Sequence, residues 1–590
     1  MFNKMNVSKY LFSMKNKFSY DMFLEKFRIQ NFRGIHDLTL TFNKGLNIII
    51  GENNSGKTRI IDALRLCLGY KDVDRTIYIN ENDFTVGLPE TESIEFSLYF
   101  KGNPDEQELF YDIFNPETQY LEIHFKYYIK VKNNRKRIYN KVWGGSFEGQ
   151  QIPDEIFQEL YHIYLDPLRD SRRYLHPGRN NILGKFFSKV ESAEYDKNEL
   201  IQDLNEQINE HRIIDFIKSS KEGYIDSHLD GMTHNDFPQF DINLIPEEYD
   251  AFVNNFFITL PIESGNLELS QNGLGYNNLI YMSILLGNLR DSNDDESIYT
   301  ALCVEEPEAH LHPQLQKSFF NYLMEFLDND YAFQIFMTSH SPILVSHANL
   351  ESLIILENIN NEISAINWYD LNLDEKDEIY FKKFFDMSKV NLLFSKKVII
   401  VEGRTEGILL QLFDKTKFNL LNNENIEIIE TDSKDSMEHY IKLFSINENK
   451  LNLKKKCVVL IDNDKKNVDS SPSELSKKFK REYCKENICI FESEKDIEFE
   501  IIHANIDNID LLEELLVDNF VVKNISLTQE FISSLRDPTS NKKEEIFKYL
   551  NKKKIKKTNF AIKIVEEWEN FDNFKIPEVI ENLFEFLKED

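Results

Sequence analysis

The sequence predicts an α/β protein with two parallel-sheet units and a helical C-terminal region. The first unit is indicated by an apolar strand, 45–50, which stops at Gly51 and leads through a short loop into a helix beginning at Lys57. The second unit is indicated by four apolar stretches that alternate with helical ones, at 397–401, 426–430, 457–461 and 487–491. At 590 residues the chain is too long for one hydrophobic core, so two to four domains are expected.

Composition limits the classes of function. The formal net charge of −31 argues against a protein that coats DNA with its whole surface, although an acidic protein can keep a local basic groove. The five cysteines show no paired metal spacing, and most lie in apolar stretches, which is typical of buried thiols in a reducing cytoplasm. No run of 18 apolar residues occurs, so we expect no membrane partner.

The pattern along the chain suggests the order of the domains. Residues 1–22 form an N-terminal extension without the apolar centre of a signal peptide. A first domain is expected over 23–390, with strands inside 27–40 and at 94–100, 119–132, 301–304 and 334–338, and a helix at 312–327. The basic residues 132–137 are predicted to form a hairpin turn, and the charged, helical stretch at about 188–262 an inserted dimerisation arm. Residues 391–590 form the second unit with its helical end.

The loop after the first apolar strand has the complete pattern G-x-x-x-x-G-K-T. Its amides cradle phosphates at a helix N-terminus, where the helix dipole favours anions. Lys57 is expected to reach the β- and γ-phosphates and Thr58 to place its hydroxyl on Mg²⁺. The predicted ATP-binding residues here are Gly51, Asn53, Asn54, Ser55, Gly56, Lys57 and Thr58.

A second part of the nucleotide site is predicted where later strands end. Glu305 and Glu306 follow a buried strand, and two adjacent buried carboxylates are costly without a cation. We expect Glu305 to hold a magnesium-bound water and Glu306 to orient the attacking water. His340 follows the next strand, where ligands of α/β proteins bind, and is interpreted as a γ-phosphate sensor. His310 and His312 either take part or simply cap and pack the following helix.

The segment at 269–275 contains Ser270 and Gly273 before an apolar helix, which by itself is an ordinary helix cap. Its position between the two nucleotide motifs makes the set resemble ABC-type ATPases of the RecF/SMC branch. That resemblance implies that Ser270 and Gly273 contact the γ-phosphate held by a second subunit, in a head-to-head homodimer closing on two ATP molecules.

Carboxylates also follow two apolar strands of the second unit. Glu402 follows the strand at 397–401, and Glu406 lies four residues later, near it if a helix opens at Gly403. Asp462 and Asp464 follow the strand at 457–461. Such a cluster fits Mg²⁺ or Mn²⁺, which prefer oxygen ligands, and a two-metal arrangement would activate water.

This second half resembles a TOPRIM domain, with Glu402 as its first acid and Asp462 and Asp464 as its paired aspartates. Together the two halves resemble the OLD (overcoming lysogenization defect) family of ATP-dependent nucleases. The segment from Glu305 to Pro313 is very close to that family's Walker B segment, and 165–170 with 176–179 looks like another of its segments. One departure is that 430–434 reads Glu-Thr-Asp-Ser-Lys where family members often have glycines.

The OLD resemblance implies further site residues. Asp496 and Glu498 lie where family nucleases carry another acidic metal-binding segment, and Lys557 resembles a late lysine thought to stabilise the transition state. Lys556 is a near-equal candidate, and in this lysine-rich stretch a solvated surface is an equally good interpretation of either.

The function implied is a DNA endonuclease or nickase that uses ATP and Mg²⁺ or Mn²⁺ and assembles as a dimer or tetramer through its ATPase domain. The resemblance also implies a role in bacterial defence against phage, with a companion protein or RNA–DNA element. The alternative is a non-nucleolytic, ATP-gated DNA clamp with a vestigial TOPRIM domain, against which the retained acidic residues argue. Strand transfer and primase-like synthesis are disfavoured, because no separate tyrosine domain or zinc module is evident.

Overall fold

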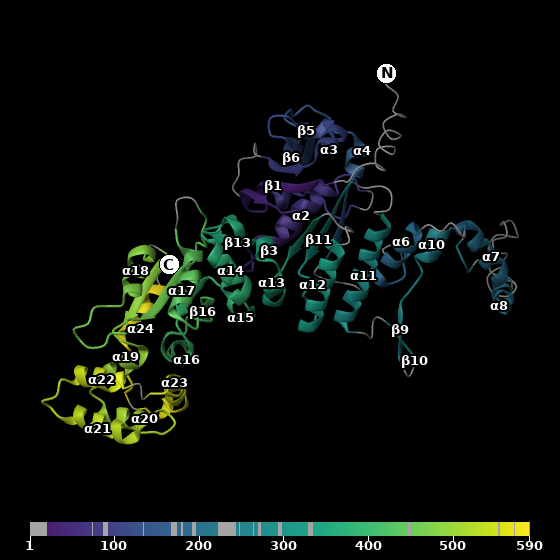
Figure 1. Ribbon diagram of the computed structural model, residues 1–590. Helices are drawn as coiled ribbons and strands as arrows, with labels where there is room; N and C mark the ends of the chain where they lie inside the picture. The colour runs from purple at the N-terminus through teal and green to yellow at the C-terminus, as the bar shows by residue number, and fades with distance from the viewer. Residues whose placement is uncertain are drawn as a thin grey trace.

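The computed structural model describes residues 21–72, 75–85, 93–133, 135–166, 174–178, 181–190, 196–209, 211–221, 244–246, 248–262, 265–268, 273–292, 298–328, 334–446, 450–485, 487–552, 555–571 and 573–588. Figure 1 follows the chain from an N-terminal sheet through a central sheet to a smaller sheet and a group of C-terminal helices. Among the described residues, none of the helices combines the length and the apolar character that a membrane span requires.

The N-terminal sheet is antiparallel, with the strand order β2-β1-β4-β6-β5 and with β7 paired to β6. Phe27, Ile29 and Phe96 are fully buried on its inner face, because alternate side chains of a strand point to opposite faces. The predicted strands at 94–100 and 119–132 are confirmed, but the basic residues 135–137 belong to β7 rather than to the turn. The strands are β1 Phe23–Phe32, β2 Ile35–Thr41, β4 Ile94–Lys101, β5 Phe114–Asn115, β6 Tyr120–Lys132 and β7 Arg135–Gly144.

The central sheet has the order β14-β13-β3-β12-β11-β8, and all its pairs are parallel except that of β13 and β14. Helix α2, Lys57–Leu68, packs between this sheet and the N-terminal one, while α11, Leu274–Ser292, and α12, Pro313–Asp328, cover the other face. Every residue of β11 is buried, as expected for a parallel strand covered on both sides. The strands are β3 Gly45–Gly51, β8 Leu160–Leu165, β11 Tyr299–Glu305, β12 Gln334–Thr338, β13 Leu353–Ile359 and β14 Glu362–Asn367.

An extended group of helices leaves the central sheet between β8 and β11 (Figure 1). In the described parts of 190–260 the elements are helical until β9, as the sequence predicts. They are α6 Ile182–Lys189, α7 Lys197–Asn209, α8 Arg212–Ser220 and α10 Tyr249–Val253, followed by the hairpin of β9 Thr259–Ile262 and β10 Gly265–Glu268.

The second unit is a parallel sheet with the order β16-β15-β17-β18. Its strands agree with the four predicted stretches to within two residues at either end. They are β15 Lys397–Val401, β16 Ile426–Glu430, β17 Lys456–Asp462 and β18 Ile488–Ser493, with helices α16 Arg404–Phe413, α17 Lys434–Phe444 and α18 Glu474–Tyr483. The C-terminal helices are α19 Ile497–Ala504, α20 Ile509–Leu516, α21 Ile525–Arg536, α22 Lys542–Asn551, α23 Lys557–Glu566 and α24 Glu578–Lys588.

One hydrophobic core joins the central sheet to the second sheet. Trp368, Phe381 and Tyr440 belong to it, and they lie on elements of both units. Helix α14, Glu375–Phe384, faces α17 across this core, and its fully buried Asp377 accepts from His439 Nδ1 at 2.6 Å and Lys442 Nζ at 2.8 Å. The two units are therefore packed against one another through apolar contacts and a buried ion pair.

Candidate nucleotide-binding and metal-binding sites

The predicted phosphate loop connects the end of β3 to the start of α2. Gly51 and Gly56 have φ of 153° and 102°, and Asn54 has φ of 68°. A Cβ atom on Gly51 would lie 2.5 Å from the backbone oxygen of Leu356, so the close approach to β13 requires glycine. Asn53 is exposed on the loop and Ser55 is buried beneath it.

The Lys57 ammonium is buried against its own loop. It donates to the carbonyl oxygens of Gly51 at 2.9 Å and Glu52 at 2.7 Å, and lies 3.4 Å from Ser55 Oγ. Burial lowers the pKa of Lys57 to about 8, while the charges of Glu306 and Glu308 oppose the shift. Because carbonyl dipoles hold the ammonium, its charge is placed for an anion in the loop.

Glu305 ends β11 beside the phosphate loop. Its side chain is buried, its Oε2 accepts from Tyr164 Oη at 2.6 Å, and Thr58 also hydrogen-bonds to it. Burial raises the pKa of Glu305, and the hydrogen bonds from Thr58 and Tyr164 oppose that rise. This carboxylate and the Thr58 hydroxyl thus form a pair of oxygens suited to a magnesium ion and its water.

The neighbouring strand ends bring Glu306 and His340 together. Glu306 Oε1 lies 3.6 Å from His340 Nε2, and burial lowers the pKa of His340, with the Lys57 charge adding to the shift. Glu308 belongs to the segment from Glu305 to Pro313, but no role was predicted for it; it accepts from the His340 amide at 2.6 Å and from Ser339 Oγ at 3.1 Å. Glu308 therefore holds the backbone of the His340 loop, a contact that only the fold reveals.

Some predicted residues lie elsewhere. Ser270 is outside the described residues, as are parts of the segments 165–170 and 176–179. Gly273 directly precedes α11, and a Cβ atom there would meet open space. His312 lies directly before α12, and its backbone oxygen accepts from the Leu315 amide at 2.8 Å, a bond that any residue at this position would accept.

The carboxylates of the second unit lie at the C-terminal edge of its sheet. Glu402 follows β15, which pairs in parallel with β17, the strand that ends at Asp462. Helix α16 opens after Gly403, whose amide donates to Glu406 Oε2 at 3.2 Å, and this turns the Glu406 carboxylate back toward Glu402. Burial raises the pKa of Glu406, and Glu402 adds to that rise while Lys557 opposes it.

Asp462 is the centre of the cluster. Its Oδ1 accepts from Ser493 Oγ at 2.7 Å, and its Oδ2 lies 3.7 Å from Lys557 Nζ. Burial, with the nearby charges of Glu406 and Asp496, raises the pKa of Asp462 well above its ordinary value. Such a carboxylate is stabilised by any cation that joins it.

Asp496 and Glu498 complete the cluster from α19, so the predicted acidic segment does reach it. Asp496 caps the helix by accepting from the Phe499 amide at 2.9 Å. Glu498 is buried, and burial together with the Asp496 charge raises its pKa to about 7. Neither carboxylate oxygen of Glu498 has a hydrogen-bond partner among the described residues.

The structure distinguishes the two candidate lysines. Lys557 begins α23, and its Nζ lies 3.5 Å from Glu498 Oε2. Burial opposes its charge, but Glu498, Asp462, Asp496 and Glu406 outweigh that effect and raise the pKa of Lys557. Lys556 instead donates to the Asn519 carbonyl at 2.7 Å.

The segment that departs from the family pattern contributes a further cation. Asp432 takes the glycine-like conformation with φ of 62°, which aspartate tolerates, and Ser433 caps α17. Lys434 then donates to the Asp462 carbonyl at 2.9 Å, pairs with Asp464, and lies 3.6 Å from Glu402 Oε2. Lys434 was not predicted from the sequence to belong to the site.

The donor set fits a divalent metal ion. Both carboxylate oxygens of Glu498 and Oε2 of Glu402 are buried and have no hydrogen-bond partner among the described residues. Oxygen ligands are the ones that Mg²⁺ and Mn²⁺ prefer. Across the same residues, no three His, Cys, Asp or Glu side chains are already arranged to hold an ion. Lys434 and Lys557 stand among these carboxylates.

Two family models match separate parts of the chain. A family model described as an AAA ATPase domain matches residues 22–345. A second model, described as the TOPRIM domain of overcoming lysogenization defect protein-like proteins, matches residues 393–464, which include Glu402, Glu406, Asp462 and Asp464.

Three curated relatives illustrate the range of similarity. An OLD nuclease of Thermus scotoductus is 24% identical over 390 residues, 64% of this chain and 71% of the relative. Endonuclease GajA of Bacillus cereus is 27% identical over 175 residues, 25% of each chain. The DNA replication and repair protein RecF of Cytophaga hutchinsonii is 25% identical over 192 residues, 30% of this chain and 49% of the relative.

Solved structures with similar parts include the SMC head domain from Thermotoga maritima, 15% identical with a TM-score of 0.26, covering 58% of this chain and 98% of that one. Another is the C-terminal region of the Burkholderia pseudomallei OLD protein, 21% identical with a TM-score of 0.25, covering 33% of this chain and 98% of that one. Because the ATPase model spans more than half of its length, the chain belongs to the AAA ATPase-domain proteins, and it carries a TOPRIM segment like that of overcoming lysogenization defect proteins.

Proposed function

We propose that the protein is an ATP-regulated, divalent-metal-dependent DNA endonuclease or nickase. The observation that carries the proposal is the convergence of Asp462 and Glu498 on Lys557, with Glu406 beside them. Buried acids around one lysine suit phosphodiester cleavage, because they can hold metal ions while the ammonium faces the developing negative charge. The names of the relatives, OLD nuclease and endonuclease GajA, support this class of reaction.

In this proposal Mg²⁺ or Mn²⁺ is held by carboxylates of the cluster and, when bound, supplies a more acidic water and stabilises the leaving oxygen. Lys557 binds the scissile phosphate, and Ser493 keeps Asp462 oriented through its hydroxyl. The residues that would hold metal are Glu402, Glu406, Asp462, Asp464, Asp496 and Glu498.

The ATPase half is proposed to bind ATP with Mg²⁺ and to control the nuclease. Lys57 and Thr58 would contact the phosphates and the ion, Glu305 would hold its water, and Glu306 and His340 would act at the γ-phosphate. Ser270 and Gly273 would complete the site of a second subunit. Control across the chain is supported by α17, which touches the carboxylate cluster through Lys434 and the ATPase half through His439 and Lys442.

The biological setting is proposed from the similarity to OLD nuclease and endonuclease GajA. The ATPase domain, 23–390, would form a homodimer or tetramer with the arm at 188–262, and 391–590 would form the TOPRIM nuclease with its helical part. The protein would act on DNA in the cytoplasm in defence against phage, with a companion protein or RNA–DNA element.

The test is plasmid cleavage with Mg²⁺ or Mn²⁺, with and without ATP, by the wild type and by Glu402→Ala and Lys57→Ala. Loss of cleavage in Glu402→Ala supports chemistry in the TOPRIM half, and Lys57→Ala then gives the sign of ATP control. Wild-type protein that cuts nothing, even with a genomic-neighbour protein or RNA added, favours the ATP-gated clamp instead.

A further inference from the structure

The chain contains one strongly basic stretch that the proposed function does not use. Between Glu122 and Glu148 no acidic residue occurs, in a chain whose net charge is −31. The same stretch contains seven basic residues: Lys126, Lys130, Lys132, Arg135, Lys136, Arg137 and Lys141. A local field of opposite sign to that of the whole protein marks a surface for an anionic partner.

The strand register gathers this charge on one face of a hairpin. Strands β6 and β7 pair Lys126 with Lys141 and Lys130 with Arg137. Both pairs lie at alternate positions of their strands, so they share the face opposite buried Phe125. Arg135, Lys136 and Arg137 are exposed at the far end.

Aromatic pairs alternate with the basic pairs on that face. Tyr128 and Tyr139 are register partners with stacked rings, 5.9 Å between centroids, and Lys130 Nζ lies over both. His124 and Trp143 form another stacked pair at 5.3 Å. Basic groups interleaved with aromatic rings are the combination that contacts both the phosphates and the bases of nucleic acids.

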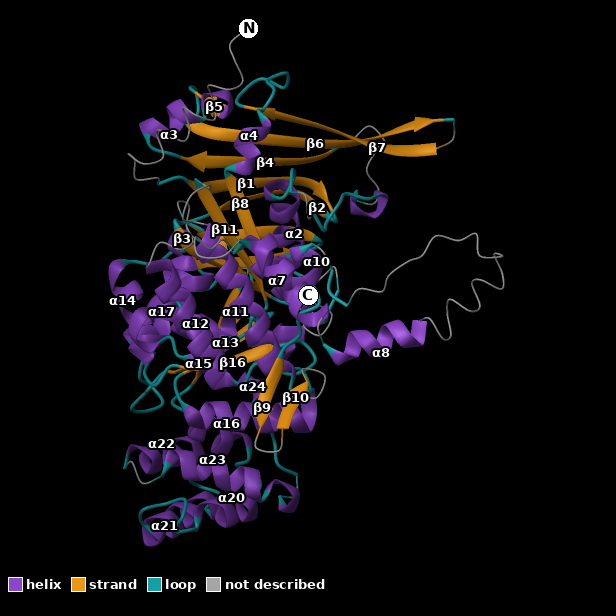
Figure 2. Cartoon of the chain, turned by 90° about the vertical axis from the view of Figure 1, so that its right-hand side faces the viewer, coloured by secondary structure: helices purple, strands orange, loops and turns teal. Residues whose placement is uncertain are grey.

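Among the described strands, none pairs with the outer part of the hairpin beside its own two strands. Strand β4 pairs with β6 as far as Tyr127, so from Tyr128 to Tyr139 the hairpin is a two-stranded ribbon. Figure 2 shows this ribbon extending beyond the other strands of the N-terminal sheet. A ribbon of this kind is narrow enough to enter the major groove of DNA.

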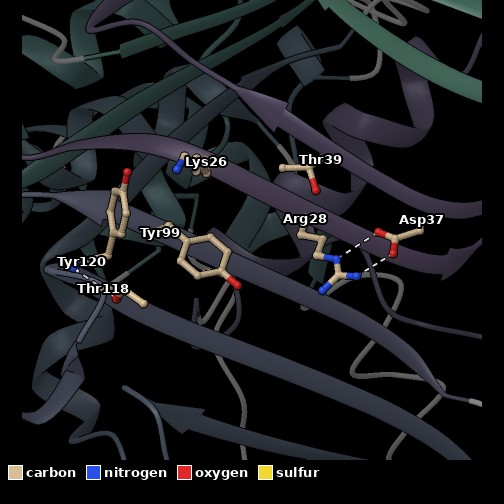
Figure 3. A pocket seen from close by; sticks show the side chains of 7 residues that line it. All are labelled: Lys26, Arg28, Asp37, Thr39, Tyr99, Thr118 and Tyr120. Carbon is tan, nitrogen blue, oxygen red and sulfur yellow. Dashed lines mark hydrogen bonds and ion pairs between the residues drawn. The ribbon is translucent and has the colours of Figure 1, made fainter. Parts of the chain in front are cut away.

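The same face continues toward a shallow hollow on the sheet. The hollow, of about 540 Å³, is lined by basic and aromatic side chains that include Lys26, Arg28, Tyr99 and Tyr120 (Figure 3). Arg28 is held by Asp37 at 2.9 Å, and Lys126 by Glu95 at 2.7 Å, so this inner region is partly neutralised. The net positive charge is therefore concentrated on the ribbon.

We propose that the β6–β7 ribbon is a DNA-docking arm that binds the sugar-phosphate backbone and holds the substrate on the protein. The inference rests on the proposed function for its choice of DNA. The arm supplies binding and no chemistry, because it contains none of the carboxylates of the cluster.

The test compares DNA binding by a variant without the ribbon charge and a control that loses equal charge elsewhere. Fluorescence anisotropy of a labelled duplex and a labelled single strand is measured in the Glu402→Ala background, which removes cleavage, at several salt concentrations. The ribbon variant carries Lys130→Gln, Arg135→Gln, Lys136→Gln and Arg137→Gln, and the control, at exposed positions, carries Lys376→Gln, Lys383→Gln, Lys477→Gln and Arg481→Gln.

We expect the ribbon variant to bind at least tenfold more weakly and to lose roughly three units of salt slope on duplex, since each phosphate contact contributes about 0.9. The control should bind like its parent. The inference is overturned if the parent binds neither the duplex nor the single strand, or if the ribbon variant binds like the control. Failure of the wild type to cleave plasmid overturns only the proposed nuclease function. Adding Tyr128→Ala and Tyr139→Ala distinguishes the substrates, because lost stacking weakens the single strand alone.

Discussion

Lys557 Nζ lies 3.5 Å from Oε2 of Glu498, a carboxylate that has no hydrogen-bond partner among the described residues. The same ammonium lies 3.7 Å from Asp462 Oδ2. The negative charges of two buried carboxylates are thus balanced by a single lysine, whose side chain remains about half exposed. A lysine in this position can contact a phosphate from solvent while it stays within the cluster.

Replacing Lys557 should abolish most cleavage without disturbing ATP binding. Removing one preorganised cation from a transition state costs on the order of 10²-fold in rate, so Lys557→Met should nick plasmid at least 100-fold more slowly than the wild type. The measurement is the initial rate of supercoiled plasmid loss at saturating Mn²⁺.

Lys556→Met is the matched control, because that side chain bonds the Asn519 carbonyl outside the cluster. It should nick at nearly the wild-type rate. Equal losses in the two variants would mean that the stretch acts as a general basic surface and that Lys557 has no special role.

Lys434 should compete with metal ions. Its ammonium lies between Glu402 and Asp464, where a cation would otherwise bind. Removing this like charge in Lys434→Met should tighten Mn²⁺ binding roughly tenfold, since an interaction of about 1.4 kcal/mol is lost. The measurement is the free Mn²⁺ signal in electron paramagnetic resonance. Lys465→Met, whose Nζ lies 3.8 Å from Glu494, is the control. Weaker binding in Lys434→Met would show that the lysine assists the ion.

The contact of α14 with α17 should couple the two halves. Asp377 is fully buried and holds Lys442, whereas Asp374 meets the same lysine from an exposed position. Asp377→Asn should lower the free energy of unfolding by about 2 kcal/mol, because a buried charged hydrogen bond is lost, and should weaken the effect of ATP on cleavage. Asp374→Asn keeps the helix cap and should lower the free energy of unfolding by less than about 1 kcal/mol. Urea denaturation and plasmid cleavage with and without ATP check both parts. An unchanged ATP response in Asp377→Asn would place the coupling elsewhere.

Much of this fold could be predicted from the sequence because its buried strands are uninterrupted apolar runs. Residues 397–401 and 457–461 each run directly into an acid, so strand position and candidate ligand were found together. Lys557 could not be separated from Lys556, because the choice depends on how α23 packs against α16. The hydrogen bond between Asp377 and His439 could not be predicted from the sequence either, because it joins residues far apart in the chain.

Lys455 provides a pH test of the junction between the two sheets. It lies just before β17, and its buried ammonium donates to the carbonyl oxygens of Leu393 at 2.8 Å and Ser395 at 2.5 Å. Burial lowers its pKa to about 8 from the ordinary 10.5, with Glu357 and Glu52 opposing the shift.

Between pH 8 and 10.5 the unfolded chain therefore binds more protons at Lys455 than the folded chain does, so the contribution of Lys455 to stability rises with pH in this window. The full pKa shift of Lys455 corresponds to a change of roughly 3 kcal/mol in the free energy of unfolding. The free energy of unfolding of the wild type, minus that of Lys455→Met, should increase between pH 8 and pH 10 when both are measured by urea denaturation. The difference isolates this lysine, because Lys57 and other groups titrate alike in both proteins. A constant or falling difference would mean that the Lys455 ammonium stays as well solvated in the folded protein as in the unfolded chain, and that the junction is open to water.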